Sequence, residues 1–211
     1  MKVYSKIFLW MFLGLLVTFA TGYYVAISPN ILEKIFSVGG YILLAVIELG
    51  LVIFLSARIT KLSPTSARIM FLLYSFVSGL TFSTIFVAYQ ISAIIYIFLI
   101  AAVIFGIFGL IGYCTNLDLT KMNTYLLIGI IGILICSIIN IFVGNGTFEI
   151  IISSISIIIF LGFTAYDVQK IKELSNYIDE DNLAIYGALQ LYLDFINIFL
   201  DLLRLFGNNR D

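Results

Sequence analysis

The chain has 211 residues, of which 62% are hydrophobic and only 11% are charged, and its mean hydropathy is +1.15. A soluble domain of this length does not carry so much apolar surface, so the composition predicts an integral membrane protein that crosses the lipid bilayer several times. The sequence contains no histidine, which excludes imidazole metal sites and Ser-His-Asp chemistry. Its net charge of −1, with no basic tract, argues against a nucleic-acid partner.

Seven apolar runs follow one another along the chain, and each is long enough to cross a bilayer as a helix. The runs are continuous rather than alternating, which favours helices over barrel strands, and the only two prolines, Pro29 and Pro64, fall between runs. The first run follows two lysines, as a signal peptide does, but it is too long for one and lacks a small-x-small cleavage site. The predicted spans are residues 7–27, 38–57, 67–89, 91–113, 123–143, 147–170 and 183–206. We therefore expect an all-α membrane protein with a single seven-helix transmembrane domain over residues 1–211.

Lysine and arginine residues are distributed unevenly between the two ends of the predicted spans. The side that holds the N-terminus carries Lys2, Lys6, Arg58, Lys61, Arg68, Lys121, Lys170 and Lys172. The other side carries Lys34, Arg204 and Arg210. Because basic residues are retained in cytoplasmic loops, this bias predicts a cytoplasmic N-terminus and, with seven spans, a C-terminus on the outside.

The last predicted span carries a polar stripe. Gln190, Asp194, Asn197 and Asp201 are spaced by four, three and four residues, so they fall within about 60° of arc on a helix. Asp194 lies near the middle of the span, where inserting a charged carboxylate costs roughly 2.5–3.5 kcal/mol. Membrane proteins that keep such a residue turn it toward water, an ion or a partner. We therefore expect the last helix to be central in the bundle, with its stripe lining a polar pathway or a hydrogen-bonded seam.

A second intramembrane acid, Asp167, lies near the end of the sixth predicted span, and the same helical face carries Ser153, Ser156 and Thr164. Spans six and seven form a hairpin, and the midpoint between positions 167 and 194 is 180.5, inside an acidic segment. A symmetrical turn there would place Asp167 and Asp194 at the same depth, facing each other. Two such carboxylates in a low dielectric cannot comfortably both ionise, so the pair is expected to titrate as a unit.

This pair suggests a proton-controlled gate. Protonated aspartates would share a hydrogen bond and hold the helices together, whereas ionised ones would repel, open the path and attract a hard cation such as calcium, for which Asp167 and Asp194 offer oxygen ligands. The alternative is that each aspartate only satisfies a nearby backbone or hydroxyl group and stabilises the fold.

Three further residues are candidates for the same pathway. Glu48 lies mid-span on the second helix, where it either lines the path or pairs with a cation. Arg58 ends that helix and either reaches Asp167 as a latch or extends to the lipid headgroups. Asp201 either pairs with Arg204 three residues later or forms the outer mouth of the path.

Three segments of the chain resemble one family. Residues 164–172, Thr-Ala-Tyr-Asp-Val-Gln-Lys-Ile-Lys, are similar to the sixth-helix motif of the Bax-inhibitor family, also called the transmembrane BAX inhibitor motif family. Residues 191–199, Leu-Tyr-Leu-Asp-Phe-Ile-Asn-Ile-Phe, together with 202–207, resemble its seventh-helix motif, and residues 112–122 resemble its fourth loop. With the span count, the resemblance covers almost the whole chain.

The resemblance implies a seven-helix fold with the last helix at the centre, and a pH-sensitive calcium leak in which Asp167 and Asp194 form a di-aspartyl sensor. Similarity to the short bacterial YetJ-like members further implies the bacterial cytoplasmic membrane, calcium as the permeant ion, protons as the regulator and no cofactor. Two features depart from the family pattern. Asp201 stands where a neutral residue is expected, and the tail after Gly207 is short and has no basic run.

Two other classes of function are alternatives. An intramembrane aspartyl protease also uses two membrane aspartates, and Tyr166-Asp167 fits its first motif. Its second motif requires Gly-x-Gly-Asp, whereas Asp194 follows Leu-Tyr-Leu, so we do not expect an enzyme. The other alternative is a regulatory membrane protein that binds a membrane protease or another protein partner without moving ions.

Overall fold

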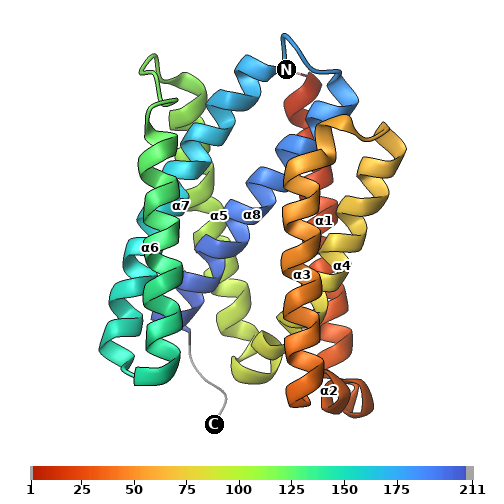
Figure 1. Ribbon diagram of the computed structural model, residues 1–211, viewed down its shortest axis with the longest axis vertical. Helices are drawn as coiled ribbons and strands as arrows, with labels where there is room; N and C mark the ends of the chain where they lie inside the picture. The colour runs from red at the N-terminus through yellow and green to blue at the C-terminus, as the bar shows by residue number, and fades with distance from the viewer. Residues whose placement is uncertain (1, 208–211) are drawn as a thin grey trace. The chain divides into compact units, whose positions relative to one another are not determined.

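A computed structural model describes residues 2–207, apart from the side chains of Val38 and Tyr41, and helices dominate this part of the chain (Figure 1). Seven of the helices are long and apolar enough to cross a membrane, which confirms the predicted all-α, seven-span fold. The helices are α1 (Lys2–Ala26), α2 (Pro29–Phe36), α3 (Val38–Arg58), the short 3-10 helix η1 (Ile59–Lys61), α4 (Pro64–Ala88), α5 (Ile91–Cys114), α6 (Met122–Val143), α7 (Gly146–Leu174) and α8 (Glu180–Phe206). Arg210 and the tail after Gly207, both considered above, lie outside the described residues.

The described helices form two compact units, and α8 contributes to both. The first unit comprises residues 2–90 and 174–192, and the second comprises residues 91–173 and 193–207. Of the seven spans, α8 has the largest buried share, 78% of its most apolar window against 0% for α6. The last helix is therefore the most enclosed one, as its polar stripe predicted.

In the first unit, α1 packs closely along α4. A Cβ atom added at Gly79 of α4 would lie 2.6 Å from Thr21 Cβ and 2.8 Å from the Thr18 carbonyl oxygen, so the approach requires a glycine. Thr18 Oγ1 donates to the Ser75 carbonyl oxygen at 2.9 Å and lies 2.7 Å from the Tyr192 hydroxyl. These contacts anchor the first half of α8 to the seam between α1 and α4.

Tyr192→Phe tests this anchor. Tyr192 is fully buried, and its ring makes edge contacts with Phe71 and Tyr74 at centroid distances of 5.8 and 5.9 Å, which phenylalanine preserves. Removing the hydroxyl alone should lower the free energy of unfolding by about 0.5–1.5 kcal/mol, the usual net value of one hydrogen bond. Tyr177→Phe, at a side chain that is 86% exposed, is the matched control and should change nothing. Equal melting temperatures for the two variants in detergent would contradict the anchor.

Ion pairs hold the start of α8 in the same unit. Lys6 Nζ of α1 lies 3.1 Å from Glu180 and 3.0 Å from Asp181, and Arg68 Nη2 of α4 lies 2.9 Å from Asp181. All four side chains are partly exposed, so solvent screens these pairs and each contributes little to stability. The contacts show that α1, α4 and α8 begin at the same end of this unit.

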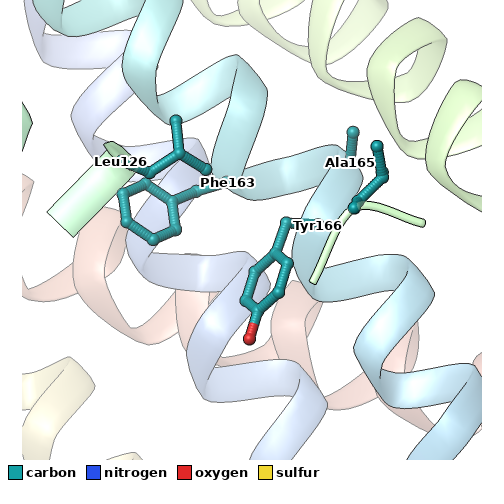
Figure 2. Close-up of a cluster of buried hydrophobic side chains, with 5 residues drawn as sticks. Leu126, Phe163, Ala165 and Tyr166 are labelled. Atoms are coloured by element: carbon teal, nitrogen blue, oxygen red, sulfur yellow. The ribbon is translucent and has the colours of Figure 1, made fainter. Parts of the chain in front are cut away.

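In the second unit, α6 packs on α7 through a small apolar cluster (Figure 2). Its buried members are Leu119, Leu126, Phe163, Ala165 and Tyr166. Gln169 of α7 holds the connection between α5 and α6, because its amide donates to the Leu117 carbonyl oxygen at 2.8 Å and accepts from the Leu119 N–H at 2.9 Å. In that connection Asp118 accepts hydrogen bonds from Thr120, which lower the pKa of its carboxyl, as expected for a loop residue.

The connection between α7 and α8 differs from the one predicted. Helix α7 continues to Leu174 and α8 begins at Glu180, so the turn comprises residues 175–179 and is not centred at 180.5. Asp179 caps α8 by accepting from the N–H groups of Asp181 and Asn182, and the acidic residues lie in the first turn, where the helix dipole favours negative charge. The hydropathy pattern predicted only the apolar parts of α7 and α8, because the end of α7 and the start of α8 carry charged residues.

A short helix, α2, lies in what was predicted as a plain connection between the first two spans. Pro29 occupies its first turn, where a missing N–H costs no hydrogen bond. Ile31, Leu32, Ile35 and Phe36 alternate with polar residues in an amphipathic pattern, which an eight-residue helix shows too briefly for hydropathy to detect.

Candidate functional site

The candidate site is built on α7 and on the second half of α8, both in the second unit. Asp167 is 5% exposed, and on the same helix Ser153, Ser156 and Thr164 are also buried, so the polar face predicted for this span is turned inward. The packing of Phe163 against Leu126 of α6 helps fix the rotation of α7 about its axis (Figure 2). That rotation directs Asp167 away from the exposed surface.

Asp194 is equally enclosed, at 4% exposed. The neighbouring Phe195 packs against Phe98 and Phe105 of α5, with ring centroids 5.1 and 5.6 Å apart, and Phe199 one turn later also contacts Phe98. These rings define an aromatic face on α8 that packs on α5. The polar stripe occupies another side of the helix.

Asp167 and Asp194 are both buried in the second unit, close enough for their charges to interact. The charge of Asp167 acts directly on Asp194, and Thr164 lies within hydrogen-bonding reach of the Asp194 carboxylate. Lys170, one turn beyond Asp167, supplies a nearby positive charge and also lies over the Tyr166 ring, with Nζ 5.4 Å from the centroid. Because the turn before α8 is not centred between the two residues, equal distances to the turn do not account for their proximity, which comes from helix packing.

The second oxygen of Asp194 is a buried acceptor without a hydrogen-bond partner among the described residues. Buried polar atoms are almost always satisfied, and one that is not costs about 1–3 kcal/mol. An ionised carboxylate oxygen can only accept, so this atom is open to a hydrogen-bond donor, a proton or a cation. The pair can therefore share one proton or offer oxygen ligands to a hard cation.

The other residues of the polar stripe are buried to different degrees. Gln190 and Asn197 are half-buried, and the Asn197 amide donates to the Leu193 carbonyl oxygen of its own helix at 2.7 Å. Asp201 is 3% exposed and pairs with Arg204, whose Nη1 lies 2.8 Å from Oδ1, so the predicted i+3 ion pair is present. In the described part of the chain no three Asp, Glu, His or Cys side chains converge in a geometry suited to a metal ion.

The two candidates on α3 belong to the first unit. Glu48 is half-buried and accepts a hydrogen bond from Thr81 of α4 at 2.6 Å. Arg58 has an exposed side chain at the end of α3, so the latch to Asp167 stays a prediction. Sequence reasoning did not anticipate the role of Thr81, because a hydroxyl in a span is most often a packing residue.

The sequence does not single out Gly112 of α5, which makes the closest contact with α7. A Cβ atom there would collide with the Ala165 carbonyl oxygen and lie 2.7 Å from Ala165 Cα, two residues before Asp167. Gly106, Gly109 and Gly112 share a three-residue spacing that is a weak helix-contact motif. Nothing in the sequence distinguishes the one that touches α7.

The fold and the site define a seven-span helical membrane protein that keeps ionisable side chains inside its spans. The model of the family described as "Inhibitor of apoptosis-promoting Bax1" matches residues 1–211, and the chain belongs to this Bax-inhibitor family. The predicted resemblance is thereby confirmed.

Bacterial relatives match almost the whole chain. The inner membrane protein YbhL of Escherichia coli is 40% identical over 213 residues, which cover 98% of this chain and 91% of YbhL. A protein of Borreliella burgdorferi is 38% identical over 216 residues, 100% of this chain and 93% of its own. A membrane protein of Streptococcus pyogenes serotype M1 is 40% identical over 168 residues, 78% of this chain and 73% of its own. Together with the seven apolar helices, these matches identify an integral membrane protein.

Proposed function

We propose that the protein is a pH-sensitive calcium leak channel of the bacterial cytoplasmic membrane, gated by protonation of Asp167 and Asp194. The observation that carries the proposal is the buried pair itself, with one carboxylate oxygen of Asp194 left without a hydrogen-bond partner in the described structure. A carboxylate pair enclosed in a membrane span is costly to the fold, so a purely structural role accounts for it poorly.

The pair can act as a gate through its charge. With a proton between them, the two carboxyl groups share a hydrogen bond and hold α7 to the second half of α8. Without it, two negative charges repel in a low dielectric and at the same time attract a divalent cation. The leak is therefore expected to be small at acidic pH and to increase as the pH rises.

Calcium flux into proteoliposomes of the purified protein, measured between pH 5 and pH 8, tests the proposal. The wild-type flux should rise with pH, and Asp167→Asn and Asp194→Asn should each remove most of that dependence. Asp118→Asn is the matched control, because it neutralises one carboxylate in the exposed loop between α5 and α6 and should leave the profile unchanged.

Two results would contradict the proposal. One is a pH profile that is the same in both dyad variants as in the wild type. The other is the absence of flux above that of empty liposomes from protein shown to be folded, which would favour a regulatory protein that acts on a membrane protease or other partner without moving ions.

A further inference from the structure

Asp201 is a third buried carboxylate in the second unit. It lies seven residues beyond Asp194 on α8, a distance of about 10 Å along the helix axis, and only 3% of it is exposed. It is on the same polar stripe as Asp194, so the two acids follow one another along one side of the helix.

Among the described residues, the surroundings of Asp201 combine hydroxyl groups with the cation of Arg204. The hydroxyls of Ser156 and Ser153, both on α7, lie within reach of its carboxylate. Ser153 is fully buried, and its Oγ has no completed hydrogen bond in the described structure. The charged group facing Asp201 is Arg204 of its own helix, which approaches Oδ1 at 2.8 Å.

The ion pair is asymmetric. The Asp201 side chain is 5% exposed, whereas that of Arg204 is 48% exposed. The carboxylate is thus fixed inside the protein, while the guanidinium reaches it from the surface on a long, rotatable side chain. An exposed cation can leave for water or lipid headgroups at little cost, but leaving a buried ionised carboxylate without a counter-ion is costly, so another cation is favoured in its place.

We propose that Asp201, Ser153 and Ser156 form a second cation-binding station on the leak pathway, and that Arg204 is its displaceable counter-ion. This inference rests on the proposed function and adds a site to it. A permeating calcium ion displaces the guanidinium and binds the carboxylate and hydroxyl oxygens while it keeps part of its water shell. When the ion leaves, Arg204 pairs with Asp201 again. One carboxylate and two hydroxyls bind calcium weakly, and conduction requires sites that release the ion again.

Equilibrium binding of radioactive calcium to the protein in lipid nanodiscs tests the station without any measurement of transport. The reference is the double variant Asp167→Asn/Asp194→Asn, in which the dyad no longer contributes. It should retain weak calcium binding, and adding Asp201→Asn should abolish that binding. Ser153→Ala/Ser156→Ala in the same background should weaken it and provides a second test if the Asp201 variant does not fold.

Arg204→Gln distinguishes a displaceable counter-ion from a structural ion pair. In the dyad-free background it should strengthen calcium binding roughly fivefold, the equivalent of about 1 kcal/mol for a partly exposed ion pair. Unchanged or weaker binding in Arg204→Gln, or equal binding with and without Asp201, would overturn the proposal. The readout is calcium binding and not calcium flux. The proposed site at Asp201 and the proposed leak activity can therefore be refuted independently of each other.

Discussion

Gly112→Ala is expected to lower the free energy of unfolding by about 1–3 kcal/mol, the usual cost of overpacking a close contact. The added methyl group would collide with the Ala165 carbonyl oxygen of α7, and backbone cannot move aside as a flexible side chain does. α5 and α7 must separate or shift at the point where α7 carries Asp167. The same variant should therefore alter the pH profile of calcium flux even where the protein still folds.

Gly106→Ala is the matched control for this prediction. Gly106 is on the same helix, and a Cβ atom added there meets no other atom within 4 Å. This variant should be neutral, or stabilising by up to about 1 kcal/mol, since alanine is the better helix former. Similar melting temperatures for Gly106→Ala and Gly112→Ala in detergent would contradict the close contact between α5 and α7.

Asp194→Leu is expected to make the protein more stable while abolishing its pH response. Leucine removes both a buried charge and the unpartnered Oδ2, which alone costs about 1–3 kcal/mol, and it is close to aspartate in length. A gate built from two carboxylates that repel each other lowers the stability of the folded protein, because residues selected for function are often not optimal for stability. The apparent melting temperature in detergent at neutral pH is the measurement.

Asn197→Leu, one turn further along the stripe, controls for the general effect of a more apolar helix. The Asn197 amide is satisfied by the Leu193 carbonyl oxygen, so its loss removes a hydrogen bond without relieving an unpartnered atom. This variant should show no comparable gain. If Asp194→Leu is less stable than the wild type, Asp194 stabilises the fold and the structural interpretation of the pair is correct.

Much of this site was accessible from the sequence because the bilayer simplifies the problem. An apolar run of spanning length has one structural solution, and a charged residue within it must face inward. These two rules located the seven spans, the inward face of Asp194 and the polar face shared by Asp167 and Ser156. The pairing of Asp201 with Arg204 followed from helical spacing alone.

The remaining features depend on packing between helices, which hydropathy does not describe. The turn before α8 was misplaced because charged helix ends and charged loops have the same composition, so Glu180 and Asp181 were read as part of the loop. The importance of Gly112 depends on which neighbour faces it. The contact between the Tyr192 hydroxyl and Thr18 joins residues that are 174 positions apart in the chain, so no local sequence pattern indicates it.

The central claim is that protonation of the Asp167–Asp194 pair controls the leak, and an infrared titration tests it most directly. With carbon-13 aspartate, the carbonyl band of a protonated carboxyl group can be followed against pH in the same proteoliposomes that serve for calcium flux. The account predicts that a band lost in Asp194→Asn disappears as the pH rises, with the same midpoint at which the flux increases. A flux that keeps its pH dependence after the band has gone, or a midpoint well separated from that of the band, would contradict it.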